Sequence, residues 1–182
     1  MKKLPYLLLI LINFSNLLIA QDKISLGVNA GLAIPVADLS DTQKFGFEFG
    51  GICCISTKIS FVKSVVGCRY TIFPGRTKTN NVDGINNSFT HMVDHNDFNP
   101  FTILLGPQIE INDFTYFLLA ITSNYEEEWR LGLDIELSES YPIGMSNILI
   151  NIGTKFSYMN IAGKEKGEGS VNAFRMVIGV YF

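Results

Sequence analysis

The stretch Phe174-Arg175-Met176-Val177-Ile178-Gly179-Val180-Tyr181-Phe182 contains large apolar side chains at every second position. This set comprises Phe174, Met176, Ile178, Val180 and Phe182. A spacing of two places all of them on one face of a β-strand, and the intervening face is mixed in polarity. In a soluble sheet protein the apolar face contacts the core, whereas in a transmembrane barrel it contacts lipid and the mixed face lines the lumen. Features elsewhere in the sequence decide between these two interpretations.

The first twenty residues have the layout of a secretory signal peptide. Lys2 and Lys3 precede the apolar run 7–12, and Ala20-Gln21 is a suitable cleavage point. We therefore predict a signal peptide over 1–20 and a mature barrel domain over 21–182. Removal of the signal peptide takes away two lysines and no acid, so the net charge changes from −3 to −5. An acidic mature chain favours no nucleic-acid partner.

Alternating hydrophobicity predicts strands throughout the mature chain. No apolar run there approaches the roughly 20 residues of a membrane helix. The alternating segments are 25–34, 44–56, 61–73, 101–111, 114–123, 129–137, 147–158 and 174–182. Most are close to the length of about 9–11 residues with which a tilted strand crosses a bilayer. The predicted fold class is all-β, an eight-stranded antiparallel up-and-down transmembrane β-barrel.

The facing of segment 114–123 depends on the turn before it. A two-residue turn would place Phe114 on the same face as Ile111. A three-residue turn would instead place Phe117, Leu119 and Ile121 there. We prefer the second arrangement, because it turns Ala120, Thr122 and Asn124 inward.

Pro107 interrupts the otherwise regular segment 101–111. Proline cannot donate to a strand ladder, and a closed barrel has no edge where it could be placed without cost. We therefore expect a β-bulge at Pro107.

The connections between the predicted strands sort by length. If both ends of the mature chain lie in the periplasm, connections 35–43, 74–99, 124–128 and 160–172 lie outside the cell. The short turns then lie in the periplasm, as is usual for outer-membrane barrels. Connection 74–99 is the longest irregular stretch, and loops beyond about 12–15 residues are usually functional or disordered. We predict that it contacts an envelope or extracellular protein.

Charged residues are confined to the predicted inward faces, and the outward faces carry none. The inward charged residues are Glu48, Lys63, Arg69, Glu110, Arg130, Asp134, Glu136, Lys155 and Arg175. A lipid-facing Lys or Arg costs about 2–4 kcal/mol at the bilayer midplane, so this segregation favours an outward face in lipid. Four acids and five bases in a lumen only just wide enough for side chains would pair. We predict a plugged lumen with a charge network.

Aromatic residues fall near the ends of several predicted strands, on what we interpret as the apolar face. They are Tyr70, Phe73, Phe101, Trp129, Tyr158, Phe174 and Phe182. Such residues are typical of the aromatic girdles at the two membrane interfaces.

An exported chain of this size with eight alternating strands and a terminal Phe resembles the small bacterial outer-membrane β-barrels, the family of OmpX and the OmpA membrane domain. The resemblance implies an outer-membrane location, contact with outer-membrane lipid, and a last strand (174–182) that is read by the barrel-assembly machinery. Members of this family serve adhesion, envelope integrity or secretion.

Three functions are compatible with the sequence. The first is a structural or surface-interaction role through the external loops, and the second is that of a membrane component in a secretion or transport assembly. The third is a soluble periplasmic lipocalin-like barrel that binds an apolar ligand, which would require an apolar lumen and a polar outside.

Residues that could carry chemistry are few. His91 and His95 in the long connection are weak candidates for a metal site, because two histidines with nearby carboxylates could bind a divalent cation. No nucleophile motif accompanies them, so we expect no enzymatic activity, and no sequence motif indicates a cofactor.

Overall fold

The structure is a computed structural model that describes residues 19–83, 88–126, 128–144, 148–162 and 169–182. Side chains are described for the same ranges except 19–23 and 78–93. The predicted signal peptide falls almost entirely outside these residues and stays a prediction. The elements are β1 (Ile19–Val36), α2 (Asp38–Thr42), β2 (Gly46–Thr57), β3 (Val62–Ile72), β4 (Thr77–Asp83), β5 (Ser88–Asp94), β6 (Phe101–Glu110), β7 (Thr115–Tyr125), β8 (Trp129–Pro142), β9 (Leu149–Ala162) and β10 (Asn172–Tyr181).

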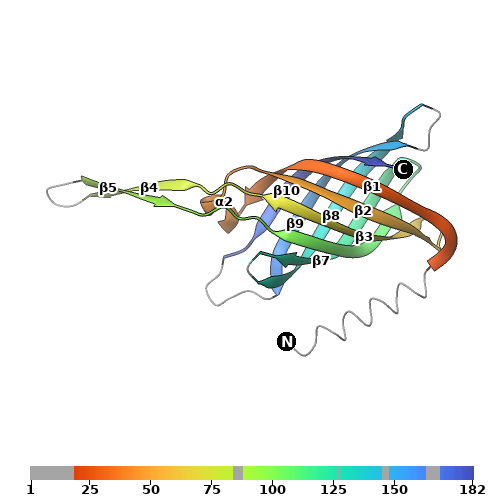
Figure 1. The fold of residues 1–182 in the computed structure, drawn as a ribbon, viewed down its shortest axis with the longest axis horizontal. Coiled ribbons are helices and arrows are strands. Elements are labelled where there is room, and N and C mark those ends of the chain that lie inside the picture. The colour runs from red at the N-terminus through yellow and green to blue at the C-terminus, as the bar shows by residue number, and fades with distance from the viewer. Residues whose placement is uncertain (1–18, 84–87, 127, 145–147, 163–168) are drawn as a thin grey trace.

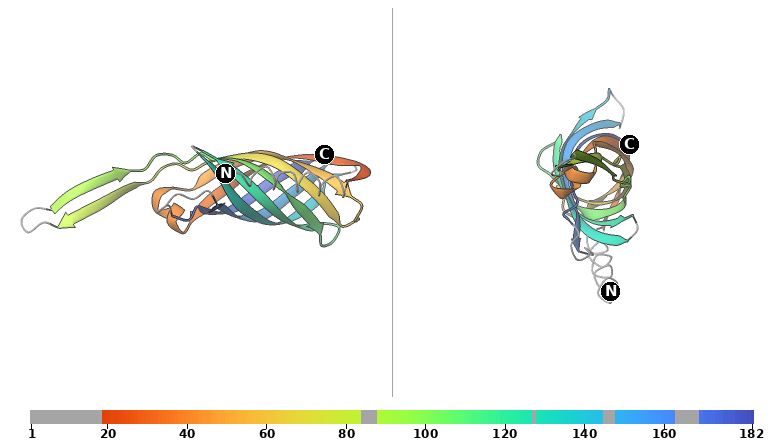
Figure 2. Two further views of the ribbon diagram at one scale, coloured as in Figure 1. Left: turned by 90° about the horizontal axis from the view of Figure 1, so that it is seen from below. Right: turned by 90° about the vertical axis from the view of Figure 1, so that its left-hand side faces the viewer.

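Eight of these strands form a closed barrel in the order β1-β10-β9-β8-β7-β6-β3-β2, which confirms the predicted fold class. Every neighbouring pair is antiparallel, and the barrel closes where β1 pairs with β10 from Gly27 opposite Tyr181 to Val36 opposite Asn172. Seen along its axis, the barrel has a round cross-section (Figure 2). Among the described residues, no helix is long and apolar enough to cross a membrane.

The connections between barrel strands lie at two ends. We call one the loop end, because it carries α2 and the connections β3–β6, β7–β8 and β9–β10. We call the other the terminal end, because it carries the short turns together with the start of β1 and the end of β10 (Figure 1). This arrangement agrees with the sorting of long and short connections that the sequence predicts, except that the β7–β8 connection (126–128) at the loop end is short.

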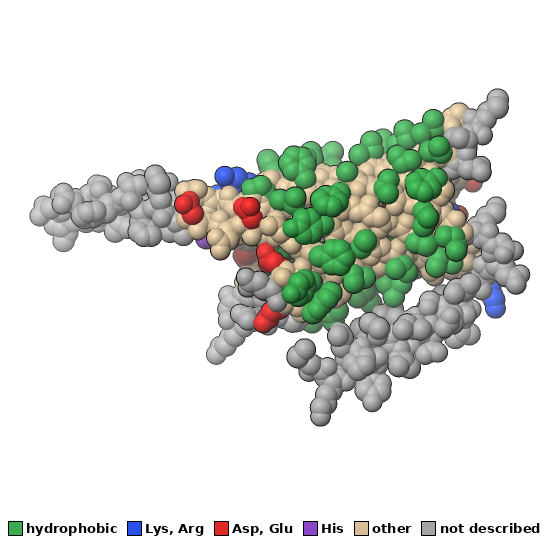
Figure 3. All heavy atoms as spheres, in the orientation of Figure 1, with side chains coloured by type: hydrophobic (Ala, Val, Ile, Leu, Met, Phe, Trp, Pro, Cys, Tyr) green, Lys and Arg blue, Asp and Glu red, His purple; other side chains and the backbone are tan. Residues whose placement is uncertain are grey.

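The side chains alternate between the lumen and the outside, as the sequence indicates. On β10 and at the residue after it, the exposed residues are Phe174, Met176, Ile178, Val180 and Phe182, and Arg175 and Val177 between them are buried. On β7 Ala120, Thr122 and Asn124 face inward, which confirms the preferred facing of that strand. Apolar side chains cover the visible outer surface of the barrel as a broad belt (Figure 3).

One outward charge contradicts the prediction of a charge-free outer face. Strand β8 continues beyond Leu137 to Pro142, and this extension places Glu139 outward and exposed. Glu139 pairs with Thr115, the first residue of β7, so it lies at the terminal end of the belt. There it accepts a hydrogen bond from the Tyr141 hydroxyl.

The prediction that connection 74–99 is irregular is wrong, because β4 and β5 form a two-stranded hairpin within it. The hairpin projects away from the loop end of the barrel (Figure 1). The connection 35–43 likewise contains the short helix α2, whose Leu39 is buried.

Phe73 is wrongly predicted as a girdle residue on the outer face. It is fully buried and stacks on Phe98 with ring centroids 6.0 Å apart. The alternation of β3 explains this placement, because Tyr70 and Ile72 point outward and the next residue must point inward.

The bulge expected at Pro107 is absent. Pro107 pairs with Ser64 in an unshifted β3–β6 ladder. On its other side, pairing with β7 is interrupted at Gly106 and Pro107 and resumes in the same register. The exposed Pro107 is therefore accommodated by a local loss of β6–β7 hydrogen-bond pairing, without an inserted residue.

Gly106 brings β6 and β7 close together, and its replacement by Ala is expected to destabilise the barrel strongly. A Cβ at this position would lie 2.0 Å from the Leu119 carbonyl oxygen and 2.6 Å from the Ala120 Cα, so the two backbones would have to separate. The heat-dependent shift in electrophoretic mobility of a folded barrel measures the outcome, and we expect most of the folded species to be lost. Gly51→Ala is the matched control, because the nearest atom to its Cβ is 3.6 Å away. Equal folding of both variants would contradict the close approach.

Candidate functional site

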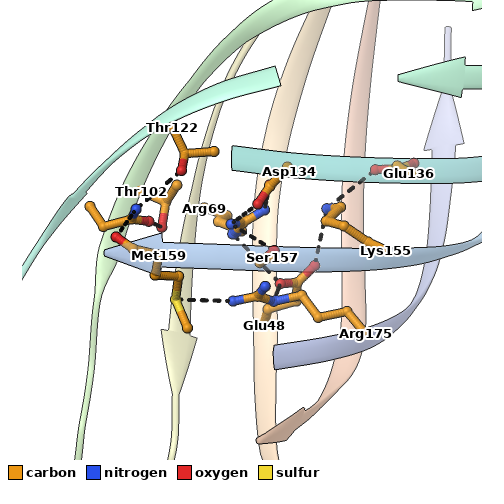
Figure 4. Close-up of polar contacts among 11 residues, drawn as sticks. Glu48, Arg69, Thr102, Thr122, Asp134, Glu136, Lys155, Ser157, Met159 and Arg175 are labelled. Atoms are coloured by element: carbon orange, nitrogen blue, oxygen red, sulfur yellow. Dashed lines mark hydrogen bonds and ion pairs between the residues drawn. The ribbon is translucent and has the colours of Figure 1, made fainter. Parts of the chain in front are cut away.

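Six of the nine charged residues predicted inside the barrel meet in one buried cluster. We call Glu48, Arg69, Asp134, Glu136, Lys155 and Arg175 the lumen cluster (Figure 4). They project inward from β2, β3, β8, β9 and β10, and each side chain is at most 6% exposed. Three carboxylates and three basic groups balance one another in charge.

Glu48 is the centre of the lumen cluster, because its carboxylate contacts all three basic residues. Its Oε2 lies 2.6 Å from Arg175 Nε and 3.7 Å from Arg69 Nε. Its Oε1 accepts a hydrogen bond of 3.4 Å from Lys155 Nζ. The contact with Arg175 is the shortest of the three.

The other two carboxylates, Asp134 and Glu136, each contact one of the basic residues that Glu48 also contacts. Asp134 binds Arg69 through two contacts, and the Arg69 Nη2–Asp134 Oδ1 contact is 3.1 Å long. Arg69 Nη2 also lies 3.4 Å from the Ser157 hydroxyl. Glu136 Oε2 lies 3.3 Å from Lys155 Nζ. These contacts connect all six residues into one continuous network.

Hydroxyl groups extend this network toward the terminal end. Glu136 Oε1 accepts hydrogen bonds from the Ser138 hydroxyl at 2.7 Å and from the Tyr116 hydroxyl at 3.4 Å. The hydroxyls of Tyr116 and Tyr181 lie 3.2 Å apart. These three residues are uncharged and so are not among the predicted site residues, although each continues the inward alternation of its strand.

The remaining predicted site residues lie apart from the lumen cluster. Lys63 and Glu110 form a separate ion pair of 2.5 Å at the terminal end, and both side chains are about one third exposed (32% and 34%). Arg130 is half-buried near the loop end. His95 is half-buried, and the side chain of His91 lies outside the described residues, so the metal site stays a prediction. Within the described part of the chain, no group of three or more potential metal ligands occurs.

Apolar residues fill the lumen on both sides of the cluster. Toward the loop end, Phe73, Met159 and Leu39 form a buried group with Ala33 and Ala173. Toward the terminal end, a second buried group contains Ile52, Cys54, Val65, Leu104, Leu118, Ala120 and Tyr181. Beyond it a cavity of about 150 Å³ opens between the Lys63–Glu110 pair and the two tyrosines.

The distribution of polarity opposes the lipocalin-like alternative. A barrel that binds an apolar ligand in water needs an apolar lumen and a polar outside. This barrel has six charged groups in its lumen and large exposed apolar side chains on all eight of its strands.

The solved structures that this chain resembles are small outer-membrane β-barrels. Neisserial surface protein A (NspA) matches with a TM-score of 0.54 and 16% identity, over 87% of this chain and 95% of that protein. The Yersinia pestis outer-membrane protein Ail, in a phospholipid bilayer nanodisc, matches with a TM-score of 0.47 and 13% identity over 88% of this chain and 100% of Ail. Ail in complex with the heparin analogue sucrose octasulfate matches with a TM-score of 0.46 and 11% identity, over the same shares of the two chains.

Sequence comparison adds nothing to these structural matches. No protein-family model matches the chain, and no curated protein matches it. At identities of 11–16% the structural matches concern the fold. The fold is that of the small eight-stranded outer-membrane β-barrels, of which NspA is an example.

Proposed function

We propose that this chain is an outer-membrane protein with a closed lumen that presents its loop end, and above all the β4–β5 hairpin, to partners outside the cell. The observation that carries the proposal is the outer surface of the barrel. Exposed apolar side chains occur on all eight barrel strands, whereas a soluble monomer rarely exposes a contiguous apolar patch beyond a few hundred Å². A bilayer accounts for this belt, because acyl chains cover apolar side chains that would otherwise contact water.

The closed lumen is supported by the filling of the interior. The lumen cluster spans the barrel from β2 to β8, and two apolar groups lie above and below it. An eight-stranded barrel has room for little more than its own side chains. The cavity of about 150 Å³ is confined to the terminal end.

Membrane fractionation with detergent extraction, followed by electrophoresis with and without boiling, tests the location. We expect the protein in the outer-membrane fraction, with a mobility that changes on boiling because the folded barrel resists the detergent. Recovery in the soluble periplasmic fraction without a heat shift would overturn the proposal.

Reconstitution into a planar lipid bilayer tests the closed lumen. Because paired charges and apolar side chains fill the interior, we expect no steady conductance from the wild-type protein. Resolved conductance steps in proportion to the amount of inserted protein would contradict the closed lumen while leaving the membrane location intact.

The contact role of the hairpin is tested by a deletion of 80–97. We expect the shortened protein to keep its heat shift and its place in the membrane, because β4 and β5 pair only with each other. The deletion also removes Asn96 and Asp97, but their bonds to Gln43 and Gly75 lie outside the barrel strands. Binding to cell surfaces or to co-purifying envelope proteins should be lost. Unchanged binding would direct attention to the other loops.

A further inference from the structure

A β-bulge at the loop end exposes a cation and an aromatic ring side by side. Phe47 pairs with Ile72, whereas Gln43 pairs with Gly75, so the β2 side carries one residue more than the β3 side between these pairs. Gln43 and Gly46 are buried, and the two residues between them, Lys44 and Phe45, are both exposed. A bulge re-aims side chains in this way, and here it breaks the alternation of the outer face at one place.

The close approach of the two strands at the bulge depends on Gly46. A Cβ at this position would lie 2.1 Å from the Ile72 carbonyl oxygen. The bulge is thus fixed by local packing. It holds Phe45, which is 71% exposed, at the loop-end border of the apolar belt.

A second cation lies on the same face of the ladder. The Arg76 backbone N–H donates to the Thr42 carbonyl at 2.8 Å, and the Lys44 N–H donates to the Pro74 carbonyl at 2.8 Å. Lys44 and Arg76 therefore flank the Gln43–Gly75 bridge as diagonal neighbours, a relation in which side chains lie about 7–8 Å apart at their base. Long flexible side chains at this separation can converge on a single anion.

The surroundings leave both cations available. Lys44 and Arg76 are exposed, and within the described part of the chain neither belongs to an ion pair. Figure 3 shows blue Lys and Arg atoms at the loop-end border of the apolar belt, with red Asp and Glu atoms beside them. The carboxylate of Asp97 lies near them and accepts a hydrogen bond of 2.9 Å from the Gly75 N–H.

We propose that Lys44, Phe45 and Arg76 form a binding site for the phosphate of an anionic lipid in the leaflet that meets the loop end. The site rests on the proposed membrane location. An exposed ring at the border of the belt inserts among acyl chains, and cations just beyond it lie at the depth of the headgroups. Basic residues at that depth attract anionic headgroups. Phe45 should strengthen the binding of a lipid but not of free phosphate, since only the lipid has acyl chains that contact the ring.

Native mass spectrometry of the purified protein in an uncharged detergent tests the site. The probes are dihexanoyl phosphatidic acid, dihexanoyl phosphatidylcholine and inorganic phosphate. We expect phosphatidic acid to bind and the Lys44→Gln/Arg76→Gln double variant to bind it about 30-fold more weakly. Phe45→Ser should weaken lipid binding about 10-fold and leave binding of inorganic phosphate unchanged. Each single variant, K44Q or R76Q, serves if the double variant does not fold.

Lys58→Gln is the matched control, because Lys58 is an exposed lysine in the β2–β3 turn at the opposite end. We expect this variant to bind phosphatidic acid as the wild type does. Equal losses in the Lys58 variant and the double variant, or full competition by inorganic phosphate with no effect of Phe45→Ser, would overturn the proposed site. Such a result leaves a heat-modifiable membrane barrel, whereas failure of the proposed function appears as a wild-type protein without a heat shift.

Discussion

Replacement of Glu48 with Gln is expected to destabilise the folded barrel by about 3–5 kcal/mol, the cost of breaking a buried ion pair by removing one partner. Glu48 is 2% exposed and contacts Arg69, Lys155 and Arg175. Without its charge, two carboxylates would remain for three buried cations. Urea unfolding of the protein in lipid vesicles, followed by the fluorescence of its single tryptophan, Trp129, measures the change.

Glu110→Gln is the control for this prediction, since it removes the same charge from a partly exposed ion pair. Glu110 pairs with Lys63 where both side chains are about one third exposed (34% and 32%), and such pairs contribute about 0–1 kcal/mol. Both variants remove only one partner of an ion pair. Replacement of a whole buried cluster by apolar residues is a different change and can be neutral. If Glu48→Gln proved as mild as Glu110→Gln, the lumen cluster would not be the buried centre that the contacts indicate.

An arginine on the outer face of the barrel is expected to be costly near the middle of the belt and tolerated at its edge. Ile178 on β10 is 56% exposed and pairs with Ala30 and Ile152, away from the strand ends. Ile178→Arg should destabilise the barrel by about 2–4 kcal/mol, the cost for this charge at the bilayer midplane. Unfolding in urea and the yield of heat-modifiable protein in the membrane measure the effect.

Ile111→Arg is the control that separates the effect of depth in the bilayer from the effect of side-chain exposure. Ile111 is 60% exposed, as open as Ile178, but it follows the last residue of β6 at the terminal end. A charge near the interface costs about 0–1 kcal/mol. In water both arginines would be harmless, so equal tolerance of the two variants would mean that the belt does not contact lipid.

The barrel could be predicted from the sequence because each of its strands carries its own period-two signal. That signal also predicts the facing of β7, where three small or polar residues turn inward. It fails for the β4–β5 hairpin, since that segment is rich in polar residues and shows no apolar face. Phe73 differs from its prediction because its aromatic character indicates a girdle residue, whereas the alternation that continues from Ile72 places it inward.

The lumen cluster could be predicted only as a set of residues, since its pairing depends on barrel closure. Glu48 and Lys155 are 107 positions apart in the chain, and no local pattern relates them. Separation of Lys63 and Glu110 from the cluster likewise follows from depth along the strands, which alternation does not encode. The bulge at Lys44 and the position of Arg76 beside it follow from a one-residue change of register between β2 and β3. Sequence alternation does not show such a change.

The membrane location and the lipid site both depend on the orientation of the outer face. Fluorescence quenching of the Ile178→Trp variant, in a Trp129→Phe background and in lipid vesicles, tests this orientation most directly. We predict strong quenching by lipids brominated near the middle of their acyl chains and almost none by aqueous acrylamide. Quenching by acrylamide without quenching by the brominated lipids would place Ile178 in water and contradict the membrane barrel.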